Sequence, residues 1–200
     1  MKQCFFYGSK EQKLYDTKVG FHMDFIKTRI DGVFLIKRNA IVDGRGYFGR
    51  LYCEREFFRN GLNDSFVQDN VCYNRNRYTL RGLHFQTERE EGKLVTCLRG
   101  SIWDVCVDIR RESSTFCKYV AYELSEANQN MLFIPKGCAH GYITLEENSV
   151  ILYKMTEFYI SGNEGGYRYD DPSFSIKWPC SLEDVVISEK DKCLPYIKVI

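Results

Sequence analysis

Histidine is scarce in this sequence of 200 residues, and its scarcity limits the sites that the chain can build. Three histidines occur, His22, His84 and His140, so proton transfer or metal binding by imidazole falls on few positions. An excess of one charge is also lacking, because 28 Lys and Arg residues face 27 Asp and Glu residues for a net charge of +1. This balance argues against a protein that holds nucleic acid or an anionic membrane by bulk electrostatics. It leaves room for a small anionic ligand in a locally cationic cleft.

Long apolar runs are absent as well. No stretch approaches the roughly 18 consecutive apolar residues of a membrane-spanning helix. The first residues, Met1 to Gly8, break before an apolar stretch adequate for a signal peptide forms. We therefore expect a soluble, cytoplasmic protein that binds neither nucleic acid nor membrane.

The cysteines lack the close pairing of a zinc site or a disulfide scaffold. Nine are present, an odd number, with no Cys-x-x-Cys pair. Several alternate with apolar residues, as Cys106 does between Val105 and Val107. We expect reduced core thiols in the cytosol and no structural zinc. The nine are Cys4, Cys53, Cys72, Cys97, Cys106, Cys117, Cys138, Cys180 and Cys193.

Short strand-like runs are abundant after the polar first 25 residues, and 15% of the residues are aromatic. The run over 102–109 alternates cleanly, with Trp103, Val105 and Val107 on one face and Asp104 and Cys106 on the other. Many short strands with glycine turns predict an antiparallel sandwich or barrel in one domain over 26–200, after an N-terminal extension over 1–25. Further strands are expected at 33–36, 65–68, 94–98, 119–124, 131–134, 141–145 and 150–158, and short helices at 53–60, ended by Gly61, and at 188–193.

The most specific local pattern is Pro135-Lys136-Gly137-Cys138-Ala139-His140-Gly141. Pro-x-Gly-x-x-His between two strands matches the second half-motif of the cupin double-stranded β-helix, so we expect an all-β cupin-type jelly roll with a few short helices. Metal-binding cupins also need an earlier His-x-His, and here Gln86 occupies the place of the second histidine after His84. Two histidines without that partner favour acid–base work, with no metal and no cofactor.

Nine motifs then appear in an order that resembles the dTDP-4-dehydrorhamnose 3,5-epimerase family of nucleotide-sugar enzymes. The resemblance covers roughly residues 30–195. The motifs are Asp43-Gly44-Arg45-Gly46-Tyr47-Phe48, Gln68-Asp69-Asn70, Arg81-Gly82-Leu83-His84-Phe85-Gln86, Gly92-Lys93-Leu94-Val95, Asp104–Arg110, Ile134–Gly141, Tyr153-Lys154-Met155-Thr156, Tyr169-Asp170-Asp171-Pro172 and Ile187–Asp191.

The resemblance implies acid–base chemistry on a 4-keto sugar, whose C–H bonds at C3 and C5 are acidified by the ketone. Epimerisation there needs a base on one face, an acid on the other and a cation or donor on the enolate oxygen. By resemblance, His84 is the base, Asp191 orients it, Tyr153 is the acid and Lys93 stabilises the enolate. Tyrosine suits the acid, because its ordinary pKa near 10 keeps it protonated at neutral pH.

The resemblance also implies a set of binding residues and a dimer. Arg81, three residues before His84, is the candidate for the diphosphate, and Tyr159 is expected to stack on the base. Asp104 is an acid in an apolar strand that needs a partner such as His140 or Lys93, and we take Asp104 and His140 as site-shaping. The resemblance further implies a homodimer with exchanged N-terminal strands, in which we expect Arg45 and Phe48 to serve the neighbouring subunit's site. The expected binding residues are Arg45, Phe48, Arg50, Gln68, Asn70, Arg81, Asp104, His140 and Tyr159.

Three departures from the family pattern bear on the substrate. Arg50 stands where the family has a glutamate that helps read the nucleotide, Tyr169 stands for a usual tryptophan, and the loop from His84 to Lys93 is one residue short. Arg50 puts thymidine in question, so the expected nucleotide is dTDP, GDP or CDP, and the sugar a 4-keto-6-deoxyhexose or heptose.

The leading hypothesis is a cofactor-independent nucleotide-sugar 3,5-epimerase of surface-polysaccharide biosynthesis. Its alternatives are a monofunctional 3-epimerase of the same family, a metal-dependent cupin oxygenase or isomerase that uses His84, His140 and a carboxylate, and a non-catalytic sugar-nucleotide binder.

Overall fold

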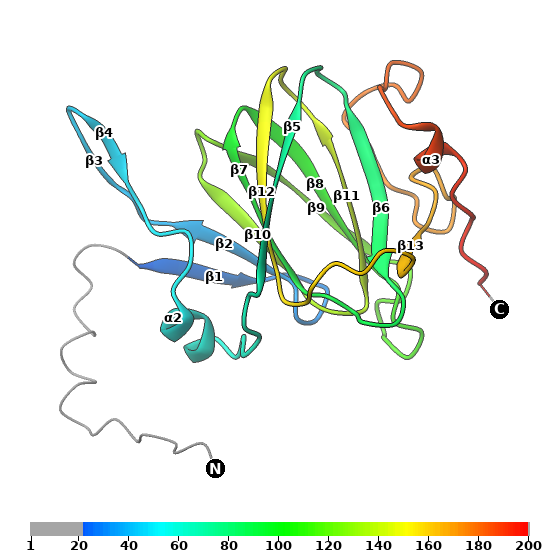
Figure 1. The fold of residues 1–200 in the computed structure, drawn as a ribbon, viewed down its shortest axis with the longest axis horizontal. Helices are drawn as coiled ribbons and strands as arrows, with labels where there is room; N and C mark the ends of the chain where they lie inside the picture. Colours follow the sequence, from blue (N-terminus) through cyan, green and yellow to red (C-terminus); the bar gives the residue numbers. More distant parts are fainter. Residues whose placement is uncertain (1–21, 200) are drawn as a thin grey trace, which may run out of the picture.

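Two antiparallel sheets make up most of the structure, a computed structural model that describes residues 22–199. The six-stranded sheet has the order β1 (Met23–Lys27), β2 (Phe34–Arg38), β10 (Asn130–Ile134), β7 (Lys93–Arg99), β12 (Ser149–Met155) and β5 (Gln68–Asn74). The five-stranded sheet has the order β13 (Glu164–Gly166), β6 (Leu80–Gln86), β11 (Cys138–Thr144), β8 (Ser101–Asp108) and β9 (Tyr119–Ser125). A hairpin of β3 (Ile41–Asp43) and β4 (Gly46–Phe48) projects from the body, and two short helices, α2 (Glu54–Arg59) and α3 (Glu189–Lys192), complete the described chain (Figure 1).

The main core lies between the two sheets. Val95 of β7, Leu132 of β10 and Ile151 of β12 meet Ile102 and Cys106 of the opposing sheet, and all five are fully buried. Burial of such side chains contributes roughly 1.5–3 kcal/mol each. The two packed antiparallel sheets confirm the expected all-β jelly roll.

The outer faces of both sheets are covered too. Phe57 of α2 packs with Phe34 and Phe133 on the outer face of the six-stranded sheet. Phe174 and Ile197, from the chain after β13, pack on the outer face of the five-stranded sheet. Both faces of β8 are therefore buried, and its two alternating sets of residues enter different clusters, as its pattern predicts.

Most expected elements are confirmed within a few residues, and two expectations were wrong. The strand expected at 65–68 lies at Gln68–Asn74, because Phe66 instead packs beside Phe57 near α2. The expected extension over 1–25 ends too late, since β1 starts at Met23 and pairs with β2 along its length. Residues 1–21 and 200, with Cys4, lie outside the described residues. Five strands were not predicted, namely β1, β3, β4, β6 and β13.

Within residues 22–199, no helix is long and apolar enough to cross a membrane.

Asp108, at the end of β8, provides a pH-dependent contribution to stability. Its side chain is fully buried, and burial by itself raises the pKa of the carboxyl group. Hydrogen bonds from Arg110, Ser113 and Thr115 outweigh this effect and lower the pKa to about 2. A depressed carboxyl pKa gives stabilisation that is complete above the unfolded value near 3.9 and is lost as the pH falls towards 2.

We expect Asp108→Asn to lower the free energy of unfolding by about 2 kcal/mol at pH 7, since each pKa unit is worth about 1.4 kcal/mol. The difference from the unmutated protein should shrink between about pH 4 and pH 2. Urea unfolding at several pH values measures it, with Asp64→Asn, at a more exposed carboxylate, as the control. A pH-independent difference would contradict this account.

Candidate active site

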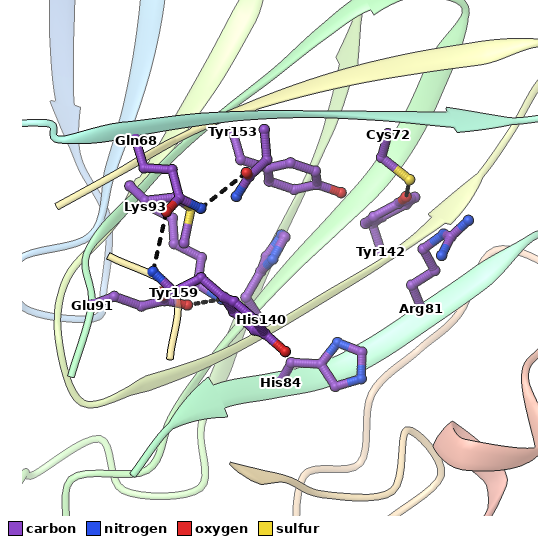
Figure 2. A pocket seen from close by; sticks show the side chains of 12 residues that line it. Gln68, Cys72, Arg81, His84, Glu91, Lys93, His140, Tyr142, Tyr153 and Tyr159 are labelled. Atoms are coloured by element: carbon purple, nitrogen blue, oxygen red, sulfur yellow. Dashed lines mark hydrogen bonds and ion pairs between the residues drawn. The ribbon is translucent and has the colours of Figure 1, made fainter. Parts of the chain in front are cut away.

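A pocket of about 300 Å³ opens between the two sheets at the end where β5 and β12 face β6 and β11. Its walls carry the polar residues of the sandwich interior, whereas the apolar core lies deeper between the sheets. The lining residues are Gln68, Asn70, Cys72, Arg81, His84, Glu91, Lys93, His140, Tyr142, Tyr153, Met155 and Tyr159 (Figure 2).

His84 is paired with Asp191, from a segment distant in sequence. The Nε2 atom of His84 lies 2.8 Å from Oδ1 of Asp191, in α3. The imidazole side chain is 41% exposed, while the carboxylate is buried. Burial raises the pKa of Asp191, but the bonds from His84, from the Gly82 amide and from Ser188 produce a net lowering. The carboxylate therefore stays ionised beside the imidazole, as needed to support an imidazolium.

The position of Asp191 depends on local features of the chain. Ser188 caps α3 by accepting a hydrogen bond from the Asp191 amide, which fixes the start of this short helix. The amide of Gly82 donates to Oδ2 of Asp191 at 3.2 Å. Gly82 has φ +116°, and a Cβ atom there would lie 2.6 Å from the Cα of Gly141 on β11. A larger residue would thus separate β6 from β11 and shift this amide.

His140 and Asp104 form a second pair, on β11 and β8. The Nε2 atom of His140 lies 2.7 Å from Oδ1 of Asp104, and both side chains are nearly inaccessible to solvent. Of the two partners expected for the buried acid, His140 is the one observed. His84 and His140 stand opposite each other in the register of β6 and β11, so both imidazoles belong to the pocket wall.

Tyr153 reaches the pocket from the opposite sheet, on β12 (Figure 2). Its ring lies edge-on to His140, with ring centroids 6.0 Å apart. Burial, followed by the influence of Tyr142, raises the pKa of Tyr153 well above its ordinary value. The hydroxyl group is therefore protonated at neutral pH and can act as a proton donor.

Lys93 enters the pocket from the start of β7 with a carboxylate beside it. Its Nζ atom lies 2.9 Å from Oε1 of Glu91, and both side chains are 9% exposed. The amide of Gln86 donates to the other oxygen of Glu91. The cation expected to face an enolate is thus held in place by a counter-ion from its own loop.

Three of the expected binding residues that line the pocket are connected to one another. Gln68 accepts a hydrogen bond from the Tyr159 amide at 3.1 Å and donates to Asn70 at 3.0 Å (Figure 2). The hydroxyl group of Tyr159 donates to Glu164, and its ring is exposed. Arg81 donates from Nε to Asn74 at 2.9 Å. An exposed aromatic ring and a cation therefore both line the pocket.

Three expected binding residues do not line this pocket. Arg45 and Phe48 belong to the projecting hairpin, where Arg45 pairs with Asp43 at 2.6 Å. Arg50 pairs with Glu56 of α2. The guanidinium of Arg50 therefore lies beside α2 and does not line this pocket.

Several pocket residues were not predicted. Glu91 could have been noticed as a carboxylate two residues from Lys93, whereas Cys72 and Tyr142 are apolar-looking positions whose role depends on which strands face each other.

Tyr169, the second departure from the family pattern, lies with Leu80 and Ile143 in a cluster apart from the pocket. Within the described part of the chain, no three His, Cys, Asp or Glu side chains gather as metal ligands do.

Comparison with known proteins places this arrangement in one family. Residues 27–198 match the family model described as dTDP-4-dehydrorhamnose 3,5-epimerase. The epimerase of that name from Methanothermobacter thermautotrophicus is 44% identical over 169 residues, which cover 84% of this chain and 91% of that protein.

Two solved structures extend the similarity to the fold. The Bacillus anthracis dTDP-4-dehydrorhamnose 3,5-epimerase with bound TDP and PPi has a TM-score of 0.85 and 36% identity over 88% of this chain and 100% of that one. The Legionella pneumophila dTDP-6-deoxy-D-glucose-3,5-epimerase in complex with dTDP-4-keto-L-rhamnose has a TM-score of 0.82 and 36% identity over 89% and 100%. The chain therefore belongs to the dTDP-4-dehydrorhamnose 3,5-epimerase family and is an isomerase.

Proposed function

We propose that this protein inverts the carbons on either side of the ketone in a nucleoside diphosphate 4-keto-6-deoxy sugar. The observation that carries the proposal is the opposition of two proton-transfer groups across one pocket. His84, with Asp191 behind it, projects from the five-stranded sheet, and Tyr153 projects from the six-stranded sheet. Inversion of a carbon needs proton removal on one face and proton delivery on the other, which this arrangement provides.

In the proposed reaction, His84 removes the proton next to the ketone and the C–H electron pair forms the enolate. The resulting imidazolium is stabilised by the ionised Asp191 at 2.8 Å. The Lys93 ammonium group, held by Glu91, offsets the negative charge that develops on the enolate oxygen. Tyr153 then delivers a proton to the other face of the carbon. The pair of His140 and Asp104 shapes the pocket floor between them.

We infer that the nucleotide is dTDP. TDP and a dTDP-linked keto sugar occupy two similar structures, which supports thymidine over guanosine or cytidine. In this proposal Arg81 binds the diphosphate, Tyr159 stacks on the base, and Gln68 and Asn70 position the sugar nucleotide. His140 and Asp104 contact or shape the sugar site. In a dimer, Arg50, which replaces the family's glutamate, would influence nucleotide recognition in the neighbouring subunit.

Incubation in D₂O with dTDP-, GDP- and CDP-linked 4-keto-6-deoxy sugars tests the proposal directly. We expect deuterium to enter both C3 and C5 of the dTDP sugar, with inversion at both carbons, when the product is examined by NMR and mass spectrometry. The enzyme should retain this activity after treatment with a chelator. No exchange with any of the three substrates, or activity lost on chelation and restored by metal, would contradict the proposal.

We further propose a homodimer with exchanged N-terminal strands, which acts in the cytoplasm in surface-polysaccharide biosynthesis. The projecting hairpin supports the dimer, since all its residues are exposed and Val42 and Phe48 are 75% and 69% exposed. Exposed apolar side chains on an arm favour burial against another surface. In a dimer, Arg45, Phe48 and Arg50 would serve the partner's site. Sedimentation equilibrium gives the mass of the assembly.

A further inference from the structure

Tyr142 is a second buried tyrosine beside the proposed acid, and the reaction described above does not use it. It lies on β11 and is 2% exposed. Its hydroxyl oxygen lies 3.1 Å from Oδ1 of Asn74 and 3.4 Å from the sulfur of Cys72, both on β5. The rings of Tyr142 and Tyr153 lie 6.4 Å apart between centroids, and Figure 2 shows the Tyr153 hydroxyl directed towards Tyr142.

The Tyr142 hydroxyl group has more acceptors within reach than it has hydrogens to donate. A phenol carries one hydrogen, so Tyr142 can donate to Asn74, Cys72 or Tyr153 but not to all of them at once. Asn74 is buried, and its Oδ1 also accepts from Nε of Arg81 at 2.9 Å. The carbonyl oxygen of Asn74 therefore keeps a donor when the Tyr142 hydroxyl turns away from it.

The proposed acid needs such a donor when it has given up its proton. A phenolate left in a buried site loses the stabilisation that water would supply, and an unpaired buried anion is costly. Burial also raises the pKa of Tyr153, which makes release of its proton less favourable. A neighbouring hydroxyl group that can donate to the new anion reverses part of this cost, because hydrogen bonds to charged groups are the stronger ones.

We propose that Tyr142 is a positioning residue for the general acid and donates a hydrogen bond to the Tyr153 phenolate formed during inversion. The inference rests on the proposed function. In the step concerned, the O–H bond of Tyr153 breaks and leaves its electron pair on the oxygen. The enolate's electron pair forms the new C–H bond with that proton. The Tyr142 hydroxyl turns from Asn74 to the Tyr153 oxygen, and Arg81 continues to donate to Asn74.

Tyr142→Phe tests this role, because the change removes one oxygen and keeps the ring. We expect inversion at saturating substrate to slow about 10- to 100-fold, the value of a hydrogen bond to a charged group. Deuterium exchange through His84, the KM and nucleotide binding should stay within about twofold. Tyr122→Phe, which alters another tyrosine packed against the core between the sheets, should match the unmutated enzyme.

The double variant Tyr142→Phe/Tyr153→Phe separates positioning from a general structural effect. If Tyr142 acts through Tyr153, its loss should have no further effect once the Tyr153 hydroxyl is gone. An equal loss in both backgrounds, or inversion by Tyr142→Phe at the unmutated rate, overturns the proposal. Absence of any exchange in the unmutated enzyme instead overturns the proposed function, and with it the role of Tyr142.

Asn74→Asp provides a second variant if Tyr142→Phe does not accumulate as folded protein. A carboxylate at this position accepts a stronger hydrogen bond from the Tyr142 hydroxyl group than the amide does. This bond keeps the hydroxyl group directed away from Tyr153. We expect inversion to slow about tenfold with His84-dependent exchange retained. Unchanged inversion in a folded Asn74→Asp enzyme overturns the proposal.

Discussion

His84→Ala is expected to abolish both deuterium exchange and inversion, with a loss on the order of 10²–10⁴-fold in each, because a positioned general base contributes that much. Within the pocket, the imidazole is the proton acceptor backed by an ionised carboxylate, at 2.8 Å from Asp191. The other histidine of the pocket, His140, is paired with Asp104 and is almost inaccessible to solvent. The substitution therefore removes the base without an obvious replacement nearby. NMR of the substrate during incubation in D₂O measures both rates.

A matched control for His84→Ala is His22→Ala. His22 is 52% exposed and lies beside Asp24 at the start of the described chain, away from the pocket. The His22→Ala variant should catalyse deuterium exchange and inversion at the rates of the unmutated enzyme. Exchange retained at both carbons in His84→Ala would contradict the assignment of His84 as the base.

Tyr153→Phe should separate the two proton transfers. We expect inversion to fall on the order of 10²–10⁴-fold, since no acid then serves the second face of the sugar. Deuterium exchange should persist, because His84 is 41% exposed and can exchange the proton it has removed for a solvent deuteron. The imidazole then returns this deuteron to the same face of the carbon. Comparison of product formation with isotope entry into recovered substrate measures the difference.

Tyr73→Phe is the control, since Tyr73 is an exposed tyrosine on β5 whose hydroxyl bonds to Asn148 outside the pocket. Full inversion by Tyr153→Phe would contradict the role of the acid. Deuterium at C3 alone in the unmutated enzyme would identify a monofunctional 3-epimerase. Retention of Tyr153 does not by itself guarantee inversion at both carbons.

The parts of the fold that the sequence predicted are those in which the local pattern and the packing agree. Strand β8 alternates because each of its faces enters a different apolar cluster. Strand β5 was displaced in the prediction, because it lies at a sheet edge and its residues 68–74 are mostly polar. Strand β1 was missed because it pairs on one side only and exposes most of its residues.

The site was predictable where an ordered series of motifs marked it, and the predicted family and epimerase function are confirmed. Contacts between distant strands were not predictable from spacing. The proximity of Tyr142 to Tyr153 depends on the six-stranded sheet facing the five-stranded one. The pairing of Arg50 with Glu56 depends on how α2 folds back on the chain before it. No sequence pattern of period two or four encodes either contact.

Because Asp191 lies on a short helix, the stability of the fold and the stability of the active site differ in this enzyme. Helix α3 has four residues and sits outside the two sheets, held by the Ser188 cap and by contacts to β6. Segments of this kind open locally at a lower free energy than the strands of a core. An excursion of 188–193 would leave the imidazole without its carboxylate while both sheets stayed intact. Heat resistance of the fold and endurance of catalysis are thus separate traits, which can be selected or engineered independently.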